Sequence, residues 1–324
     1  MMRVFACAGE GRTRVLDDFE SITAAHAAEG TRLWVDVLNP SPAELAQLTE
    51  LFGLPAETMD DCVTGEHRPR IEEFEDHVFL LAYGVFGAEE TDTLAPRTLG
   101  IFCYDSLLIT IHREPQRTIN RLFVRCEQNG EQILGRGADV VLYDILDGMM
   151  DNYLLAVETF EDRLEALEDH ALTTADTKAF LGELQDLRSD IVRMRRLAAS
   201  HREMITPLAR GHHAFIDDAI EDRLEHVLDH LTQALELLDG LRELLYGVRD
   251  MFHSRLADRM NEIMKVLTIF ASLLLPLTVI TGMYGMNVPL WPDPNSPFAF
   301  WGIVGTMGVV ILGLLAYFRF QKWL

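Results

Sequence analysis

The sequence predicts an α+β domain with α/β/α layers, followed by a long stalk helix and two C-terminal transmembrane helices. Residues 1–137 alternate between strand-like and helix-like segments, whereas from Ala138 onward apolar residues recur at helical spacing. Two apolar runs without charged residues, Val266 to Met283 and Ala299 to Phe318, lie near the end of the chain. Each run suits a membrane span, because about 20 helical residues cross a hydrocarbon core of roughly 30 Å.

The first domain, residues 1–137, accounts for the layered part of the prediction. Ser41-Pro-Ala-Glu44 is a capping-box sequence with proline at the first helical position, which predicts a helix from Pro42 to about Phe52. Apolar, β-branched and aromatic residues predict four strands: Arg32 to Val37, Val78 to Phe86, Thr98 to Tyr104 and Leu107 to His112. Helices packed on a sheet are the expected architecture.

Long helices follow in residues 138–262, the predicted helical bundle and stalk. Apolar periodicity predicts helices from Asp139 to Glu168 and from Thr177 to Ile205. Breaks are expected at Thr173 to Asp176 and at Pro207 to His213. No strong stop occurs between Ile216 and Gly285. One helix of about 67 residues, roughly 100 Å long, is therefore expected to continue through the first span.

Basic residues flank the two spans on one side only. Arg255, Arg259 and Lys265 precede the first span, Arg319 and Lys322 follow the second, and the loop between them has none. The positive-inside rule then places both termini in the cytoplasm of a multi-pass protein of the inner (plasma) membrane, with the lipid bilayer as a partner. The predicted segments are a first transmembrane helix at 263–284, an external loop at 285–297, a second transmembrane helix at 298–319 and a cytoplasmic tail at 320–324.

The charge balance favours cations as partners and excludes nucleic acid. The chain has 28 basic and 51 acidic residues; residues 264–324 hold three basic and one acidic, which leaves 25 and 50 in the first 263, a net charge of −25. Such a domain repels nucleic acid and concentrates cations near a pore, while solubility alone is the alternative explanation. The four cysteines lack Cys-x-x-Cys spacing, which argues against a structural zinc site or a disulfide framework, so we expect reduced, buried thiols. We expect no cofactor apart from transported or regulatory divalent cations.

The segment Tyr284-Gly285-Met286-Asn287 lies between the two spans. Together with its flanking block from Met260 and the chain end Tyr317 to Leu324, it resembles the CorA family of magnesium and cobalt transport proteins, whose signature is Gly-Met-Asn. Phe52-Gly53, Asp60-Asp61 and His67 to Phe79 extend the resemblance more weakly. The resemblance implies a homopentameric funnel in which the first span of each subunit surrounds the axis.

A pore face and an ion filter follow from this resemblance. Six residues of the first span share one helical face, and ordinary helix packing is the alternative explanation for them: Asn261, Met264, Leu267, Ala271, Leu275 and Thr278. For the filter, five copies of the Asn287 amide, with Gly285 carbonyls, are expected to bind a hydrated ion. Gly285 is expected to allow a tight turn, and Tyr284 and Met286 to support the ring.

The resemblance also implies a regulatory divalent-ion site in the cytoplasmic domain, and the sequence departs from the family there. Asp61 matches one side of that site, but the acidic partner on the stalk appears as His226, with Asp229 close by. Histidine favours zinc, nickel or cobalt over magnesium. Asp250 resembles an acidic ring near the cytoplasmic entrance. An exposed polar helix face is the alternative explanation for these positions.

The sequence thus predicts a divalent cation channel that admits Mg²⁺, with Co²⁺ or Ni²⁺, and is gated by cytoplasmic divalent ions. It predicts no enzyme, because it contains no nucleophile elbow, His-Glu-x-x-His or phosphate-binding loop. A proton-coupled zinc transporter of the same superfamily is the first alternative, supported by His226 and by an outer loop that retains only Asp293 as an acidic residue. A membrane-anchored cytoplasmic sensor is the alternative from another class.

Overall fold

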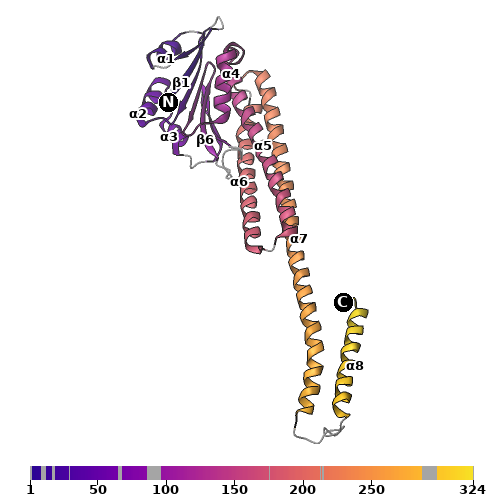
Figure 1. The fold of residues 1–324 in the computed structure, drawn as a ribbon. Coiled ribbons are helices and arrows are strands. Elements are labelled where there is room, and N and C mark those ends of the chain that lie inside the picture. Colours follow the sequence, from indigo (N-terminus) through magenta and orange to yellow (C-terminus); the bar gives the residue numbers. More distant parts are fainter. Residues whose placement is uncertain are drawn as a thin grey trace. The chain divides into compact units, whose positions relative to one another are not determined.

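The computed structural model describes residues 2–8, 12–16, 19–28, 30–64, 68–85, 96–174, 176–211, 213, 215–286 and 298–323. The chain forms two compact units, residues 1–248 and 249–324. Figure 1 shows the first as a layered domain with long helices and the second as a pair of helices. Helix α7 (Asp218–Tyr284) contributes to both units.

A seven-stranded sheet with the order β2-β1-β3-β7-β6-β5-β4 forms the centre of the first unit. β3 and β7 pair in parallel, with Leu33 opposite Leu107, and the other neighbouring strands are antiparallel. The strands are β1 (Met2–Ala8), β2 (Arg12–Leu16), β3 (Arg32–Leu38), β4 (Arg70–Glu73), β5 (His77–Gly84), β6 (Arg97–Tyr104) and β7 (Leu107–His112).

Helices cover both faces of this sheet, which confirms the predicted α/β/α layers (Figure 1). One face packs against α1 (Phe19–His26), α2 (Pro42–Phe52) and α3 (Ala56–Thr64) in a core of aliphatic and aromatic side chains. The other face contacts α4 (Arg117–Ile133) and α5 (Ala138–Thr173). The β3 strand supplies both cores because its side chains alternate: Val35 faces the first core, while Trp34 packs against Phe123 of α4.

The long helices agree with the periodicity except at one proline. Helix α7 has 67 residues, as predicted, and α6 (Thr177–Arg210) begins at the predicted residue. The break predicted at Pro207 to His213 begins only after Arg210, because α6 continues through Pro207. A proline removes a single N–H donor, and near the end of a helix this loss leaves only one carbonyl without its intrahelical partner.

The strand predicted at Val78 to Phe86 begins one residue earlier, at His77, and ends at Gly84. Phe86 lies outside the described residues. The predicted helix from Pro42 to Phe52 has the predicted bounds. Its capping box is present, since the Glu44 amide donates to Ser41 Oγ and the Ser41 amide donates to Glu44 Oε2. Cys7, Cys62, Cys103 and Cys126 are free and buried, as expected.

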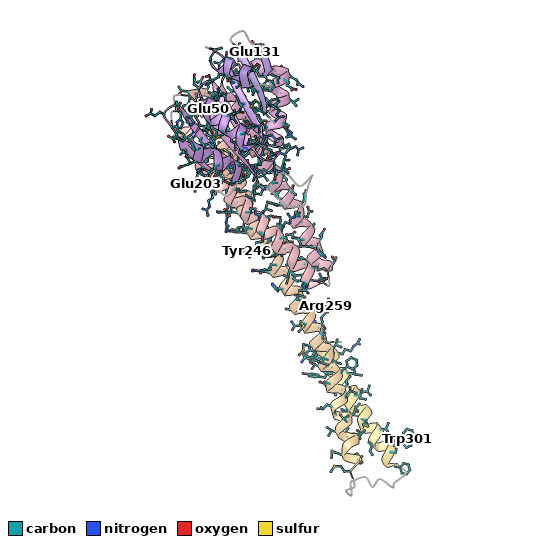
Figure 2. All side chains as sticks on the ribbon, turned by 90° about the vertical axis from the view of Figure 1, so that its left-hand side faces the viewer. Glu50, Glu131, Glu203, Tyr246, Arg259 and Trp301 are labelled. Carbon is teal, nitrogen blue, oxygen red and sulfur yellow. The ribbon has the colours of Figure 1, made fainter. Side chains whose placement is uncertain are left out.

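The second unit contains the end of α7 and α8 (Ala299–Phe320). Both helices are long and apolar enough to cross a membrane. They run side by side in both views, and Lys265 of α7 donates to the Lys322 carbonyl just after α8 (Figures 1 and 2). Trp301, at the start of α8, has 70% of its surface exposed (Figure 2).

Candidate functional site

The predicted filter residues lie at the end of α7, where the helix stops at Tyr284. The Gly285 amide donates to the Thr281 carbonyl at 2.9 Å, and the Met286 amide donates to the Met283 carbonyl at 3.2 Å. The chain turns at Gly285 as expected, but the turn does not use a left-handed φ. An added Cβ would lie 3.3 Å from the Thr281 carbonyl oxygen, which makes the position tight. Asn287 lies outside the described residues.

The membrane-span part of α7 has two distinct sides. Half-buried positions recur at helical spacing and face α8: Lys265, Ile269, Ser272, Leu273, Pro276, Leu277, Ile280 and Tyr284. The six predicted pore residues are all exposed in the single chain: Asn261, Met264, Leu267, Ala271, Leu275 and Thr278. Because successive helical residues are about 100° apart, five of the six pore residues lie on the side opposite the half-buried set, and Asn261 lies at its edge. The predicted pore face is therefore the side that points away from α8.

This exposed side combines large apolar groups with a hydroxyl. Leu267 and Leu275 have 60% and 68% of their surface exposed, far more than a water-soluble helix would leave at successive turns. The Thr278 hydroxyl donates to backbone carbonyls of its own helix, at 2.8 Å from Leu274 and 2.9 Å from Leu275. Its oxygen lone pairs remain able to accept a hydrogen bond from a water molecule.

Asp61, the predicted regulatory ligand, is bound by an arginine within its own chain. Arg70 donates to the Asp61 carboxylate, and its Nε donates to Glu72 at 2.8 Å. Burial would lower the pKa of Arg70, but its hydrogen bonds to the two carboxylates outweigh burial and raise it. Sequence reasoning overlooked this pair, although Arg70 belongs to the segment that carries the weaker part of the resemblance.

The other predicted metal ligands do not gather around Asp61 within one chain. His226 and Asp229 are exposed on α7. Asp250 accepts two hydrogen bonds from its neighbour Arg249, at 3.1 and 2.9 Å. Over the described part of the chain, no three His, Cys, Asp or Glu side chains come together to hold a metal ion. A regulatory site at these positions would therefore need more than one copy of the chain.

A buried polar network beside β3 was also not foreseen. Asp36 accepts hydrogen bonds from Arg3 at 2.6 Å and Thr110 at 2.7 Å, and it contacts His112 Nε2 at 3.0 Å. Burial alone would raise the pKa of Asp36, but the hydrogen bonds and charges of His112 and Arg3 outweigh it and lower the pKa. The network fastens β1, β3 and β7 together. A charged residue between Val35 and Val37 is the sequence signal for it.

Comparison with known proteins agrees with this arrangement. Residues 29–319 match the family described as "CorA-like Mg2+ transporter protein". The cobalt/magnesium transport protein CorA of Thermotoga maritima is 25% identical over 91% of this chain and 84% of its own. The zinc transport protein ZntB of Yersinia pseudotuberculosis is 26% identical over 93% of this chain and 90% of its own.

A solved structure extends the match to the whole fold. The complete structure of the CorA magnesium transporter from Methanocaldococcus jannaschii superposes with a TM-score of 0.86. The two are 26% identical, and the match covers 99% of this chain and 98% of the other. Family, relatives and fold agree with the two apolar helices of the second unit. The chain therefore belongs to the CorA-like Mg²⁺ transporter family and is a membrane transporter of divalent cations.

Proposed function

We propose that the chain forms a homopentameric channel in the inner membrane, with both termini cytoplasmic, that admits Mg²⁺, Co²⁺ and Ni²⁺. One observation carries the proposal: the side of α7 opposite α8 is exposed, free of charge from Val266 to Met283, and leads directly to Gly285-Met286-Asn287. A relative named as a cobalt/magnesium transport protein supports Mg²⁺ and Co²⁺. Five such helices around one axis would bury this side in a pore.

The chemistry of the proposed pore suits a hydrated cation. Mg²⁺ gives up its water reluctantly, so amide and carbonyl oxygens at Asn287 and Gly285 would hold its water shell rather than strip it. Below them, Thr278 and Asn261 offer oxygen atoms on either side of an apolar stretch. A membrane potential that is negative inside would favour entry by about 2.3 kcal/mol per elementary charge per 100 mV.

Gating would use the apolar stretch. A narrow pore lined by Leu267, Ala271 and Leu275 excludes water when closed, and apolar constrictions of this kind stop ions by dewetting. We propose that cytoplasmic divalent ions favour the closed state by binding between subunits, with Asp61 on one subunit and Asp229 and His226 on the next. An ion would then compete with Arg70 for the Asp61 carboxylate. Asp250 would add negative charge at the cytoplasmic entrance.

Zinc is the second candidate substrate. A relative is named as a zinc transport protein, and His226 supplies an imidazole where magnesium would favour a carboxylate. The apolar outer loop favours the same alternative, because Asp293 is its only acidic residue. Membership of a transporter family argues against the alternative that the chain is a membrane-anchored sensor.

Ion entry into liposomes that hold the purified chain distinguishes these substrates. The experiment compares Mg²⁺, Co²⁺, Ni²⁺ and Zn²⁺, each with and without an imposed pH gradient. The proposed channel admits Mg²⁺ and Co²⁺ at rates that follow the membrane potential and ignore the pH gradient. Entry of Zn²⁺ that follows the pH gradient, without entry of Mg²⁺, would establish the zinc alternative instead.

A further inference from the structure

A groove with arginine side chains lies on the first unit, beside the edge of the sheet formed by β4 and β5. Helix α6 packs against both strands. The groove, which is lined by residues of α6 and of the β4–β5 region, has a volume of about 880 Å³. Its polar lining includes four arginines: Arg68, Arg193, Arg195 and Arg196. Apolar walls come from residues such as Tyr83 and Leu197. This volume is that of an ordinary small-molecule pocket.

The positive charge of the groove contrasts with the rest of the domain. The first 263 residues carry twice as many acidic as basic residues, 50 against 25, yet the lining of the groove has four arginines and a single carboxylate, Glu203. Helix α6 produces this grouping, because Ser189, Arg193, Arg196 and Ser200 follow one another by four, three and four residues. They share one face of the helix. Glu203, on the next turn, lies at the surface of the first unit (Figure 2).

The arginines differ in how they are bound within the chain. Arg195 donates two hydrogen bonds to Asp239 of α7, at 2.7 and 3.1 Å, and is held in place by them. Arg68 and Arg196 are exposed, and no acidic residue of the described chain forms an ion pair with either. Exposed guanidinium groups around a concave surface retain their donors for an anion from solution.

The floor of the groove is rigid. Tyr83 of β5 is buried, and its amide donates to His201 Nε2 of α6 at 3.0 Å. This hydrogen bond fixes β5 to α6, the helix that carries three of the four arginines. A binding surface on fixed elements loses little conformational entropy when a ligand binds. The arginine side chains are therefore presented from a preorganised frame.

We propose that this groove binds a multivalent phosphate anion, of the pyrophosphate or nucleoside polyphosphate class. Guanidinium groups are planar forks that match phosphoryl oxygens in pairs, and they keep their charge at every physiological pH. Several arginines around one pocket favour an anion with more than one phosphoryl group. The apolar wall beside them has room for an organic group attached to the phosphates.

Isothermal titration calorimetry on the purified full chain, without divalent cations, tests the proposal with sodium pyrophosphate and with ATP. Arg68→Gln and Arg196→Gln should each weaken binding about tenfold, the loss expected for one charged hydrogen-bonding partner. Arg188→Gln is the matched control, because it makes the same change at an exposed position of α6 outside the groove. Its affinity should equal that of the unaltered chain.

Comparing pyrophosphate with ATP also shows whether the phosphoryl groups alone are recognised or whether the organic group adds contacts. Equal affinities would assign binding to the phosphoryl groups, and tighter binding of ATP would add contacts to the apolar wall; both agree with the proposal. Absence of binding, or an equal loss in Arg188→Gln, would overturn it. A smaller particle in Arg196→Gln, measured by light scattering, would also overturn it, because the groove would then hold an acidic surface of a second copy.

Discussion

His201 shows how one buried side chain joins three elements of the first unit. Its Nε2 accepts from the Tyr83 amide at 3.0 Å, and its Nδ1 lies 2.8 Å from the Leu197 carbonyl and 3.1 Å from the Tyr153 hydroxyl. These partners require a neutral ring with its proton on Nδ1. Burial lowers the pKa of His201 to about 4. The hydrogen bond to the Leu197 carbonyl raises this pKa, but by less than burial lowers it.

This lowered pKa predicts a loss of stability in acid. The unfolded chain takes up a proton near the ordinary pKa of 6.5, whereas folded His201 resists protonation until about 4. Stability from the neutral ring is complete above pH 6.5 and falls as the pH drops toward 4, by roughly 3 kcal/mol in all. His201→Gln keeps an acceptor and a donor but does not titrate, so it should flatten this part of the profile.

Unfolding of the full chain by denaturant, at pH 7.5 and at pH 5, measures the effect. His226→Gln is the control, because it makes the same change at an exposed position of α7. It should retain the pH dependence of the unaltered chain. If His201→Gln lost as much stability between these pH values as the unaltered chain, His201 would not be the group responsible.

At the residue scale, the sequence could identify local chemistry but not partners across the fold. Asn287 stands out because Gly-Met-Asn and its flanking block resemble the family signature, and the free cysteines follow from their spacing. Arg70 beside Asp61 could not be predicted, because the pair depends on how α3 packs against β4. The same holds for Asp36 and His112, which are far apart in sequence and meet only when β3 pairs with β7.

At the element scale, close packing of α3 against β6 depends on a glycine. A Cβ added at Gly100 would overlap the buried Cys62 Sγ and lie 3.0 Å from the Cys62 Cβ. Gly100→Ala should therefore destabilise the fold by about 1–3 kcal/mol, the cost of overpacking a well-filled core. The alanine would push α3 away from β6, and α3 is the helix that carries Asp61.

Gly182→Ala provides the control for this prediction. Gly182 lies inside α6, and apart from the adjoining backbone of its own helix no atom lies within 4 Å of an added Cβ. Alanine there should stabilise the helix by about 0.5–1 kcal/mol, because glycine loses more backbone entropy on folding. Chemical denaturation of both variants measures the two signs. Equal free energies of unfolding for Gly100→Ala and the unaltered chain would mean that α3 does not approach β6 this closely.

Elements with strong local signals were predicted most accurately. The α2 helix has the predicted bounds because its capping box and proline act within a few residues. The 67-residue α7 follows from an apolar pattern without a break. Strands β2 and β4 and helices α1, α3 and α4 were not predicted, because they are short or polar. Strand β1 was also not predicted, although it has seven mostly apolar residues. Their structure depends on tertiary contacts, such as that of Phe5 on β1 with Phe123 on α4.

At the scale of the whole molecule, the two units differ in how far their apolar side chains are buried. Residues 1–248 enclose large cores, whereas the apolar side chains of the second unit remain exposed in a single chain, including Phe270 at 61% and Leu312 at 68%. Lipid around α8 and further copies of α7 would cover them. The sequence could predict the spans and their order, but one chain does not contain the pore, which the proposal assigns to five copies.

Magnesium entry into liposomes tests the central claim most directly, with the unaltered chain, Asn287→Ala and Asn295→Ala compared at equal protein content. Asn295 belongs to the same predicted outer loop, so its variant makes an identical chemical change in the same segment of the sequence. The account predicts that Asn287→Ala loses Mg²⁺ entry down to the level of protein-free liposomes and that Asn295→Ala retains it. Mg²⁺ entry through Asn287→Ala at the rate of the unaltered chain would contradict the account.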